Sequence, residues 1–251
     1  MCESCGCGDE KVVPVEVHDR LLAANDRTAD HLRHHFQELG VLALNLMGSP
    51  GSGKTALLEA TARRASGRFC LGALSGDLAT DRDAARLRAA GIPAREITTG
   101  SACHLDAELV HRALHDFPWR DLDVLVIENV GNLVCPAIYD LGQATNVVAL
   151  SVTEGEDKPL KYPVMFRKAD LVLLTKVDLL PHLPEVRVSA LTDALARVMP
   201  TPALLPVSAR TGEGMDTFVD WLSARITPAP RFGRAQKTEI HPAPRDAARP
   251  G

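Results

Sequence analysis

The sequence predicts an α/β protein with a doubly wound, mostly parallel sheet. Short apolar runs alternate with helical stretches along most of the chain, and this alternation is typical of parallel sheets with helices on both faces. A glycine-rich, lysine-containing loop follows the first apolar run directly, which is where nucleotide-binding folds of this class place their phosphate site. The 251 residues, 45% of them hydrophobic, suffice for one full core.

Six apolar runs have the length of buried strands: 41–47, 69–74, 124–127, 147–152, 171–174 and 203–207. Helical patterns are expected at 15–39, 54–65, 81–90, 105–115, 185–198 and 215–226. Residues 1–14 form a short tail with a metal-binding motif, and 15–226 form the nucleotide-binding domain with its leading helix. The proline-rich segment 227–251 is expected to be largely disordered.

Residues 48–55 read Gly-Ser-Pro-Gly-Ser-Gly-Lys-Thr and fit the phosphate-binding loop at every fixed position. Glycines let successive N–H groups point at one anion, and the following helix adds its positive end. Lys54 is expected to reach the terminal phosphates and act in catalysis, and the Thr55 hydroxyl to hold Mg²⁺. The alternative is a glycine-rich turn that only connects strand and helix. The expected nucleotide contacts are Gly48, Ser49, Gly51, Ser52, Gly53, Lys54 and Thr55.

Two later segments indicate guanine as the base. Thr-Lys-Val-Asp at 175–178 is similar to the Asn-Lys-x-Asp specificity motif of GTPases, with threonine in place of asparagine. The Asp178 carboxylate can accept hydrogen bonds from guanine N1–H and the 2-amino group, and Lys176 can pack its stem over the base. Ser208 and Ala209 are similar to the last GTPase box. A surface Lys/Asp pair after a strand is the alternative explanation.

The sequence indicates the residues for GTP hydrolysis less clearly than those for phosphate and base binding. Glu128 ends an apolar run and is expected to hold Mg²⁺ through water, while Gly131 can offer its N–H to a γ-phosphate. Asp77 is the candidate for a water-orienting or Mg²⁺-linked carboxylate. Asp81 is an equally plausible candidate, although an aspartate before a helix is often only an N-cap.

Three of the six cysteines, Cys2, Cys5 and Cys7, lie within the first seven residues. A segment so close to a terminus cannot build a core, and thiolates spaced this way can converge on one metal ion. An exposed disulfide is the alternative, but three thiols and a reducing compartment argue against it. The sequence therefore predicts a terminal metal site.

A second metal site is expected inside the domain. Cys103 and His104 precede a predicted helix, and Cys135 follows Gly131 by four residues. Thiolate and imidazole bind Ni²⁺ and Zn²⁺ alike, but three ligands fall short of a closed tetrahedral site, so a dimer could complete it. Isolated Cys and His residues are also common as packing or surface groups. Cys70 is interpreted as core, and the histidines at 31, 34 and 35 as solvated surface, with help in metal loading as the alternative for a histidine pair.

The net charge is −4, and no polybasic run predicts binding to nucleic acid. No apolar run approaches the roughly 20 residues that span a bilayer, and the cysteine-rich start is not a signal peptide. The sequence therefore predicts a cytoplasmic protein that does not bind a membrane.

Taken together, these motifs closely resemble the hydrogenase nickel-incorporation GTPases, the HypB family. The most specific stretch is Glu-Asn-Val-Gly-Asn-Leu-Val-Cys-Pro at 128–136, and the resemblance extends from residue 1 to about 226. It implies a P-loop GTPase of the SIMIBI type that binds GTP, GDP, Mg²⁺ and Ni²⁺, with Zn²⁺ possible at the internal site. It further implies a GTP-dependent homodimer that delivers Ni²⁺ to [NiFe]-hydrogenase, with the hydrogenase large subunit and a companion nickel-insertion protein as partners.

Two other functions stay open at this point. The related urease GTPase belongs to the same class but has no need of the Cys2, Cys5 and Cys7 motif. A metal-storage or metal-sensing protein that binds nucleotide without hydrolysing it fits the cysteines equally well.

Overall fold

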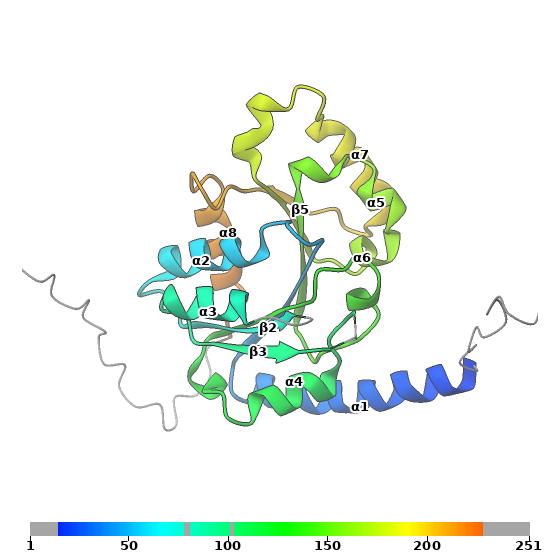
Figure 1. Ribbon diagram of the computed structural model, residues 1–251, viewed down its shortest axis with the longest axis vertical. Coiled ribbons are helices and arrows are strands. Elements are labelled where there is room, and N and C mark those ends of the chain that lie inside the picture. Colours follow the sequence, from blue (N-terminus) through cyan, green and yellow to red (C-terminus); the bar gives the residue numbers. More distant parts are fainter. Residues whose placement is uncertain (1–14, 78–80, 101–102, 228–251) are drawn as a thin grey trace, which may run out of the picture.

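The computed structural model describes residues 15–77, 81–100 and 103–227. Within them a seven-stranded sheet has the order β3-β2-β4-β1-β5-β6-β7, and every paired strand runs parallel to its neighbour (Figure 1). The strands are β1 (Leu42–Met47), β2 (Leu71–Asp77), β3 (Ala94–Thr98), β4 (Val124–Glu128), β5 (Thr145–Ser151), β6 (Leu171–Thr175) and β7 (Leu204–Pro206). The predicted doubly wound α/β fold is confirmed.

Helices cover both faces of the sheet. Figure 1 shows α2, α3 and α8 on one side, α6 and α7 on the other, and α1 beside α4. Their bounds are α1 (Val15–Glu38), α2 (Lys54–Ala65), α3 (Arg82–Ala89), α4 (Ala107–Leu114), α5 (Lys158–Lys161), α6 (Pro163–Arg167), α7 (Val188–Val198) and α8 (Met215–Ser223). Side chains that alternate along β1 show the division: Leu44 packs with the α2 cluster, and Ala43 packs with the α1 and α4 cluster.

The sheet topology places the predicted nucleotide-binding segments at one edge. β1 lies between β4 and β5, so the chain moves in opposite directions across the sheet on either side of it. Ligands of open parallel sheets bind at the carboxyl ends of the strands where this reversal occurs. The loops after β1, β2, β4 and β6 all begin at that edge.

Strand β3 was not predicted from the sequence. Its residues, Ala-Arg-Glu-Ile-Thr, include one fully buried side chain, Ile97, because β3 lies at the edge of the sheet and has one strand neighbour. The short helices α5 and α6 were also not predicted. Each of these elements is too short or too polar to produce a hydrophobic period.

Several predicted boundaries shift by a few residues. β2 begins at Leu71, so Cys70 lies just before the strand and not inside it; it is half-buried and packs against the α1 and α4 core cluster. Helix α4 begins at Ala107 rather than 105, because Asp106 caps it by accepting a 2.7 Å hydrogen bond from the N–H of Leu109.

In the part of the chain that is described, no helix is long and apolar enough to cross a bilayer. Residues 1–14 lie outside the described residues, as does the proline-rich segment from 228 onwards, so the tail boundaries stay predictions.

The leading helix α1 is attached to the domain by apolar packing and one buried amide. Leu32 and Phe36 are each 2% exposed, and the Phe36 ring packs edge-on against Trp119 at 5.4 Å. The Asn25 side chain accepts a hydrogen bond from the N–H of Ala107 and donates one to the carbonyl of Asp140, each 2.9 Å long. Asn25 therefore links α1 to the start of α4 and to the loop before β5.

We expect Asn25→Ala to lower the free energy of unfolding by about 1–3 kcal/mol, because it leaves a buried N–H and a carbonyl without their partner. Arg27→Ala, an exposed position two residues along the same helix, is the matched control. Urea unfolding followed by circular dichroism measures both. Equal midpoints for the two variants would show that Asn25 does not hold α1.

Candidate nucleotide site and metal centre

The phosphate loop has a backbone that only glycine can form at its first position. Gly48 has φ +151°, and a Cβ there would lie 2.4 Å from the carbonyl oxygen of Ala149 on the neighbouring strand β5. Gly53, with φ +94°, precedes the first residue of α2. The loop therefore curls tightly against the sheet and leads straight into a helix N-terminus, which favours an anion.

Two polar groups of this loop fit a phosphate. Among the described residues, Ser52 Oγ is the one buried side-chain polar atom with no hydrogen-bond partner. Lys54 is 8% exposed, and its Nζ donates to the carbonyl oxygens of Gly48 and Ser49, each at 3.1 Å. Burial lowers the pKa of Lys54, and the Glu128 carboxylate opposes that shift. A desolvated ammonium with neutral carbonyl partners gains much from a phosphate nearby.

Oxygen ligands suited to Mg²⁺ lie beside the loop. Thr55 Oγ1 donates to Glu128 Oε1 at 2.9 Å, and Ser75 Oγ donates to Glu128 Oε2 at 3.3 Å. Burial raises the pKa of Glu128, which is 3% exposed, and the Lys54 ammonium partly offsets this. Thr55, Asp77 and Glu128 line one cavity of about 410 Å³, so hard oxygen donors converge there, as Mg²⁺ requires.

The two candidate aspartates, Asp77 and Asp81, have different surroundings in the structure. Asp77 ends β2 and lines the cavity with Lys54. Asp81 occupies the N-cap position of α3 without a side-chain cap hydrogen bond, and its carboxylate pairs with Arg88. Asp77 therefore lies in the cavity of the phosphate loop, and the Asp81 carboxylate pairs with Arg88 of its own helix.

The segment after β4 packs directly on the phosphate loop. A Cβ at Gly131 would lie 2.8 Å from Pro50 Cγ and 2.9 Å from Pro50 N, so no side chain fits between them. One residue later, Asn132 forms an isolated antiparallel bridge with Gly48. This segment and the phosphate loop are therefore in contact along two successive residues.

A second cavity, of about 280 Å³, lies beside the loop at the ends of β6 and β7, and Lys176, Asp178 and Ala209 line it. Asp178 Oδ1 accepts a 2.6 Å hydrogen bond from Ser208 Oγ, which orients the carboxylate. Lys176 is the one non-glycine residue with positive φ in the described chain, and its Nζ donates to the Gly51 carbonyl at 2.7 Å. The predicted base-binding residues are thus brought together.

Thr175 stands where the GTPase motif has asparagine, and its hydroxyl donates to the Ser52 carbonyl at 2.6 Å. The threonine thus ties the strand end to the phosphate loop through a hydroxyl, so this departure from the motif leaves the loop supported.

Some residues in the phosphate cavity or beside the phosphate loop were not predicted. Asp83 and Arg86 of α3 face it, and Arg86 pairs with Glu59 of α2 at 3.0 Å. Glu154 accepts a hydrogen bond from Ser49 Oγ across the loop. Residue type gave no signal for these three, because charged residues on a helix or after a strand are ordinary surface features.

The three internal metal-ligand candidates come from two segments of the chain and lie close together. Cys103 Sγ lies 3.1 Å from Cys135 Sγ and 3.8 Å from His104 Nδ1, and all three ligand atoms lie within 4.8 Å of one another. The His104 ring stacks on Tyr139 with centroids 3.9 Å apart. Burial lowers the pKa of His104, which favours the neutral imidazole that a metal needs. Cys2, Cys5 and Cys7 lie outside the described residues.

Hydrogen bonds connect this cluster to the nucleotide segments. Asn132 Oδ1 accepts from the N–H of Val134, next to Cys135, at 2.9 Å. Asn129, which is 1% exposed, accepts from the N–H of Leu105, next to His104, at 3.2 Å. Both chain segments that carry the cluster, at 103–104 and at 135, are therefore hydrogen-bonded to residues that follow Glu128.

Comparison with known proteins gives concordant results. Residues 42–202 match the family model of the CobW/HypB/UreG nucleotide-binding domain. The hydrogenase maturation factor HypB of Rhizobium leguminosarum bv. viciae is 51% identical over 217 residues, which are 86% of this chain and 72% of that protein. The HypB of Escherichia coli K12 is 46% identical over 220 residues, 88% of this chain and 75% of that protein.

Solved structures show the same likeness. HypB from Archaeoglobus fulgidus has a TM-score of 0.76 at 39% identity and covers 82% of this chain and 100% of its own. HypB from Helicobacter pylori, solved in complex with nickel, also has a TM-score of 0.76 at 39% identity, covering 83% and 100%. A LAO/AO transport system kinase, at 17% identity and a TM-score of 0.51 over 86% of this chain and 67% of its own, shares the fold alone.

We expect Lys54→Ala to abolish most GTP binding and turnover while leaving the circular dichroism spectrum unchanged. Lys54 acts on the charge of the ligand, and the cost of burying its ammonium offsets what its two hydrogen bonds contribute to folding. Lys161→Ala, an exposed lysine paired with Asp157, is the control. Titration with a fluorescent GTP analogue measures the loss. Normal binding by the Lys54 variant would make the loop a structural turn only.

Proposed function

The chain belongs to the HypB family of hydrogenase maturation factors, and from this premise we propose that it is a GTP-hydrolysing nickel metallochaperone. In this proposal it assists Ni²⁺ insertion into the active site of [NiFe]-hydrogenase. The observation that supports it most is the continuous segment from Glu128 to Cys135, which contacts the phosphate loop at one end and carries a metal ligand at the other.

We assign GTP to the two cavities on either side of Gly53, which lines both. The loop N–H groups and Lys54 bind the phosphates, and Asp178 with Lys176 selects guanine. Mg²⁺, held by Thr55 and by the carboxylates of Asp77 and Glu128, would neutralise charge on the β- and γ-phosphate oxygens.

The residues of the chain perform the remaining steps. Lys54 stabilises the charge that builds on the transferred phosphoryl group, because its ammonium is already desolvated. Asp77 orients the attacking water from the end of β2, and the Gly131 N–H senses the γ-phosphate. Lys54, Asp77 and Gly131 all line the cavity of about 410 Å³, which supports these proposed roles.

We propose Ni²⁺ as the cargo of the Cys103, His104 and Cys135 cluster, with Zn²⁺ as an alternative occupant. The terminal Cys2, Cys5 and Cys7 motif is proposed as a separate nickel site. The presence of that motif favours hydrogenase over urease as the client, and the cytoplasm is the proposed location.

A second copy of the chain would complete the internal site. Three ligands are fewer than a closed coordination sphere needs. Val134 and Ile138, on either side of Cys135 in the chain, are 48% and 37% exposed, and a twofold-related copy can cover these apolar side chains. We therefore propose a GTP-dependent homodimer, with the hydrogenase large subunit and a companion nickel-insertion protein as partners.

Turnover separates this function from metal storage. Phosphate release from GTP, measured with and without Ni²⁺, should be catalytic in the full chain and lost in Lys54→Ala. A chain that binds GTP and Ni²⁺ but releases no phosphate would be a storage or sensing protein.

Base selection provides a further test. Asp178→Asn should weaken GTP binding strongly and shift preference toward xanthosine triphosphate, whose 2-oxo group accepts from the new amide. The expected cost for GTP is about 1–3 kcal/mol per lost buried partner. Asp193→Asn, an exposed aspartate on α7, is the control. Competition between the two nucleotides for a fluorescent analogue measures the ratio, and an unchanged ratio would remove Asp178 from the base site.

We expect Ni²⁺ affinity at the internal cluster to differ between the GDP form and a GTP-analogue form, with the analogue form dimeric. Movement of residues 131–135 would shift the Cys135 ligand, and coordination spheres tolerate little displacement. By linkage, Ni²⁺ must change nucleotide affinity by the same factor.

A chain lacking residues 1–8 isolates the internal cluster, and calorimetric titration in both nucleotide states measures the effect. Asn132→Ala, which removes the side-chain acceptor for the Val134 N–H, should reduce the difference between the states. Equal Ni²⁺ affinities in the unmutated truncated chain would mean that the two sites share a chain without coupling.

A further inference from the structure

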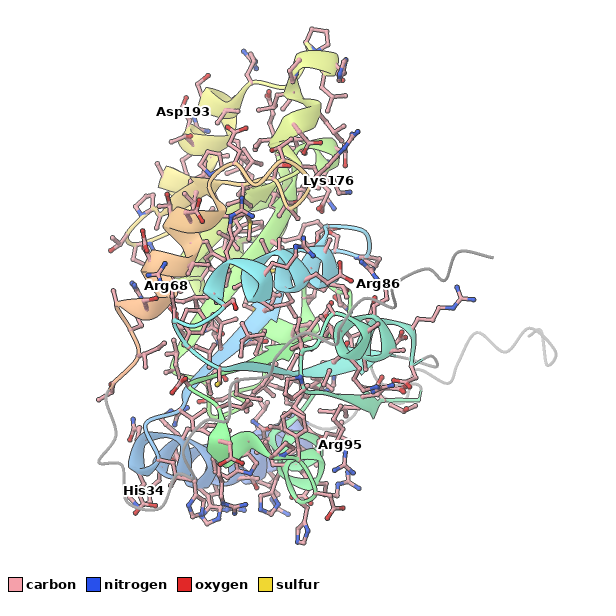
Figure 2. The ribbon with its side chains drawn as sticks, turned by 90° about the vertical axis from the view of Figure 1, so that its left-hand side faces the viewer. His34, Arg68, Arg86, Arg95, Lys176 and Asp193 are labelled. Carbon is pink, nitrogen blue, oxygen red and sulfur yellow. The ribbon has the colours of Figure 1, made fainter. Side chains whose placement is uncertain are left out.

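A cluster of histidines lies on the α1 and α4 surface, apart from the cysteine-containing centre. His31 and His35 occupy successive turns of α1, and their Nε2 atoms are 3.1 Å apart. His111 of α4 lies next to them, with its ring centroid 6.1 Å from that of His31. Figure 2 shows this end of the molecule at the labelled His34, at the opposite end of the long axis from Asp193.

We propose that His31, His35 and His111 form a further metal site for a borderline divalent cation such as Ni²⁺. Neutral imidazole nitrogens suit Ni²⁺, Cu²⁺ and Zn²⁺, and this site contains no thiolate. The proposal is independent of the nucleotide site and of the Cys103 cluster.

The spacing of the two α1 histidines matches chelation. Metal–nitrogen bonds to histidine are about 2.0–2.1 Å, so two nitrogens on one ion at ordinary angles lie about 2.9–3.4 Å apart. The observed Nε2–Nε2 distance of 3.1 Å falls in this range. The contact between the two rings thus holds both nitrogens at the separation that a bound ion would need.

Glu38 orients one of the rings. Its Oε2 lies 3.5 Å from His35 Nδ1, and its Oε1 lies 3.2 Å from His34 Nε2. A carboxylate next to Nδ1 favours the tautomer with a proton there, which leaves Nε2 unprotonated and able to bind metal. The His35 nitrogen that faces His31 is therefore the one prepared as a ligand.

Helix α4 supplies the third imidazole from a fixed position. Leu32 and Phe36 of α1 pack in one core cluster with Val110 of α4, so the two helices are held together next to the histidines. The ring centroids of His31 and His111 are 6.1 Å apart, so in this proposal the His111 side chain rotates to bring a nitrogen to the ion.

The local charges also admit a cation. Arg33 pairs with Asp30 and Asp140, and Arg112 lies 3.7 Å from Glu108. The arginines next to the histidines are thus paired with carboxylates. Because the ligands are neutral and partly exposed, we expect weaker binding here than at thiolates, and therefore faster release of the ion.

The test is a Ni²⁺ titration of the full chain by calorimetry and equilibrium dialysis. The double variant His31→Ala/His35→Ala should bind one Ni²⁺ fewer per chain, and His111→Ala should weaken this binding step by about tenfold. His115→Ala, an exposed histidine one residue beyond α4, should match the unmutated chain. Thiolate charge-transfer absorption, which reports the cysteine sites, should be unchanged in all of them.

A measurement on the unmutated protein keeps the result independent of folding. In chains with labelled histidine, paramagnetic Ni²⁺ added after the cysteine sites are filled should broaden the ring resonances of His31, His35 and His111 before those of His115 and His182. An unchanged Ni²⁺ count in the double variant, or unaffected His31 and His35 resonances at excess Ni²⁺, would overturn the site.

Discussion

The burial of two opposite charges at the carboxyl edge of the sheet is the constraint on which the rest of this site depends. Lys54 and Glu128 are 8% and 3% exposed, and each shifts the pKa of the other against the effect of burial. Each charge lessens the cost of burying the other, because opposite charges attract more strongly away from water. The tight turn at Gly48 and the hydroxyls of Thr55 and Ser75 complete the polar partners of this pair.

Both kinds of candidate site lie in loops that follow parallel strands. The candidate phosphate and base residues follow β1, β2, β4 and β6, and Cys103 and Cys135 follow β3 and β4. Asn129 accepts a hydrogen bond from the N–H of Leu105, next to His104, and Asn25 joins the start of α4 to α1. Buried asparagine side chains thus connect the loop of the Cys103 cluster to the segment after β4, and α4 to α1.

Local patterns predicted much of this structure. Helix α2 begins at Lys54 and ends at Ala65 as expected, because the phosphate loop fixes its start within a few residues. The edge strand β3 was not predicted, because most of its side chains are only partly buried and give no hydrophobic pattern. The approach of Cys103 to Cys135, 32 residues later, depends on the tertiary packing of two loops, which spacing alone cannot give. The different surroundings of Asp77 and Asp81, in the cavity and beside Arg88, likewise depend on tertiary structure.

The contact between Gly131 and Pro50 has a mechanical consequence. Protein interiors resist compression, and a junction without room for a methyl group transmits displacement instead of absorbing it. Any shift of Pro50 must therefore reappear as a shift of similar size in the segment that follows Gly131. The stiffness of this junction, more than the strength of any single bond across it, therefore determines how much of a displacement at Pro50 reaches the far end of that segment.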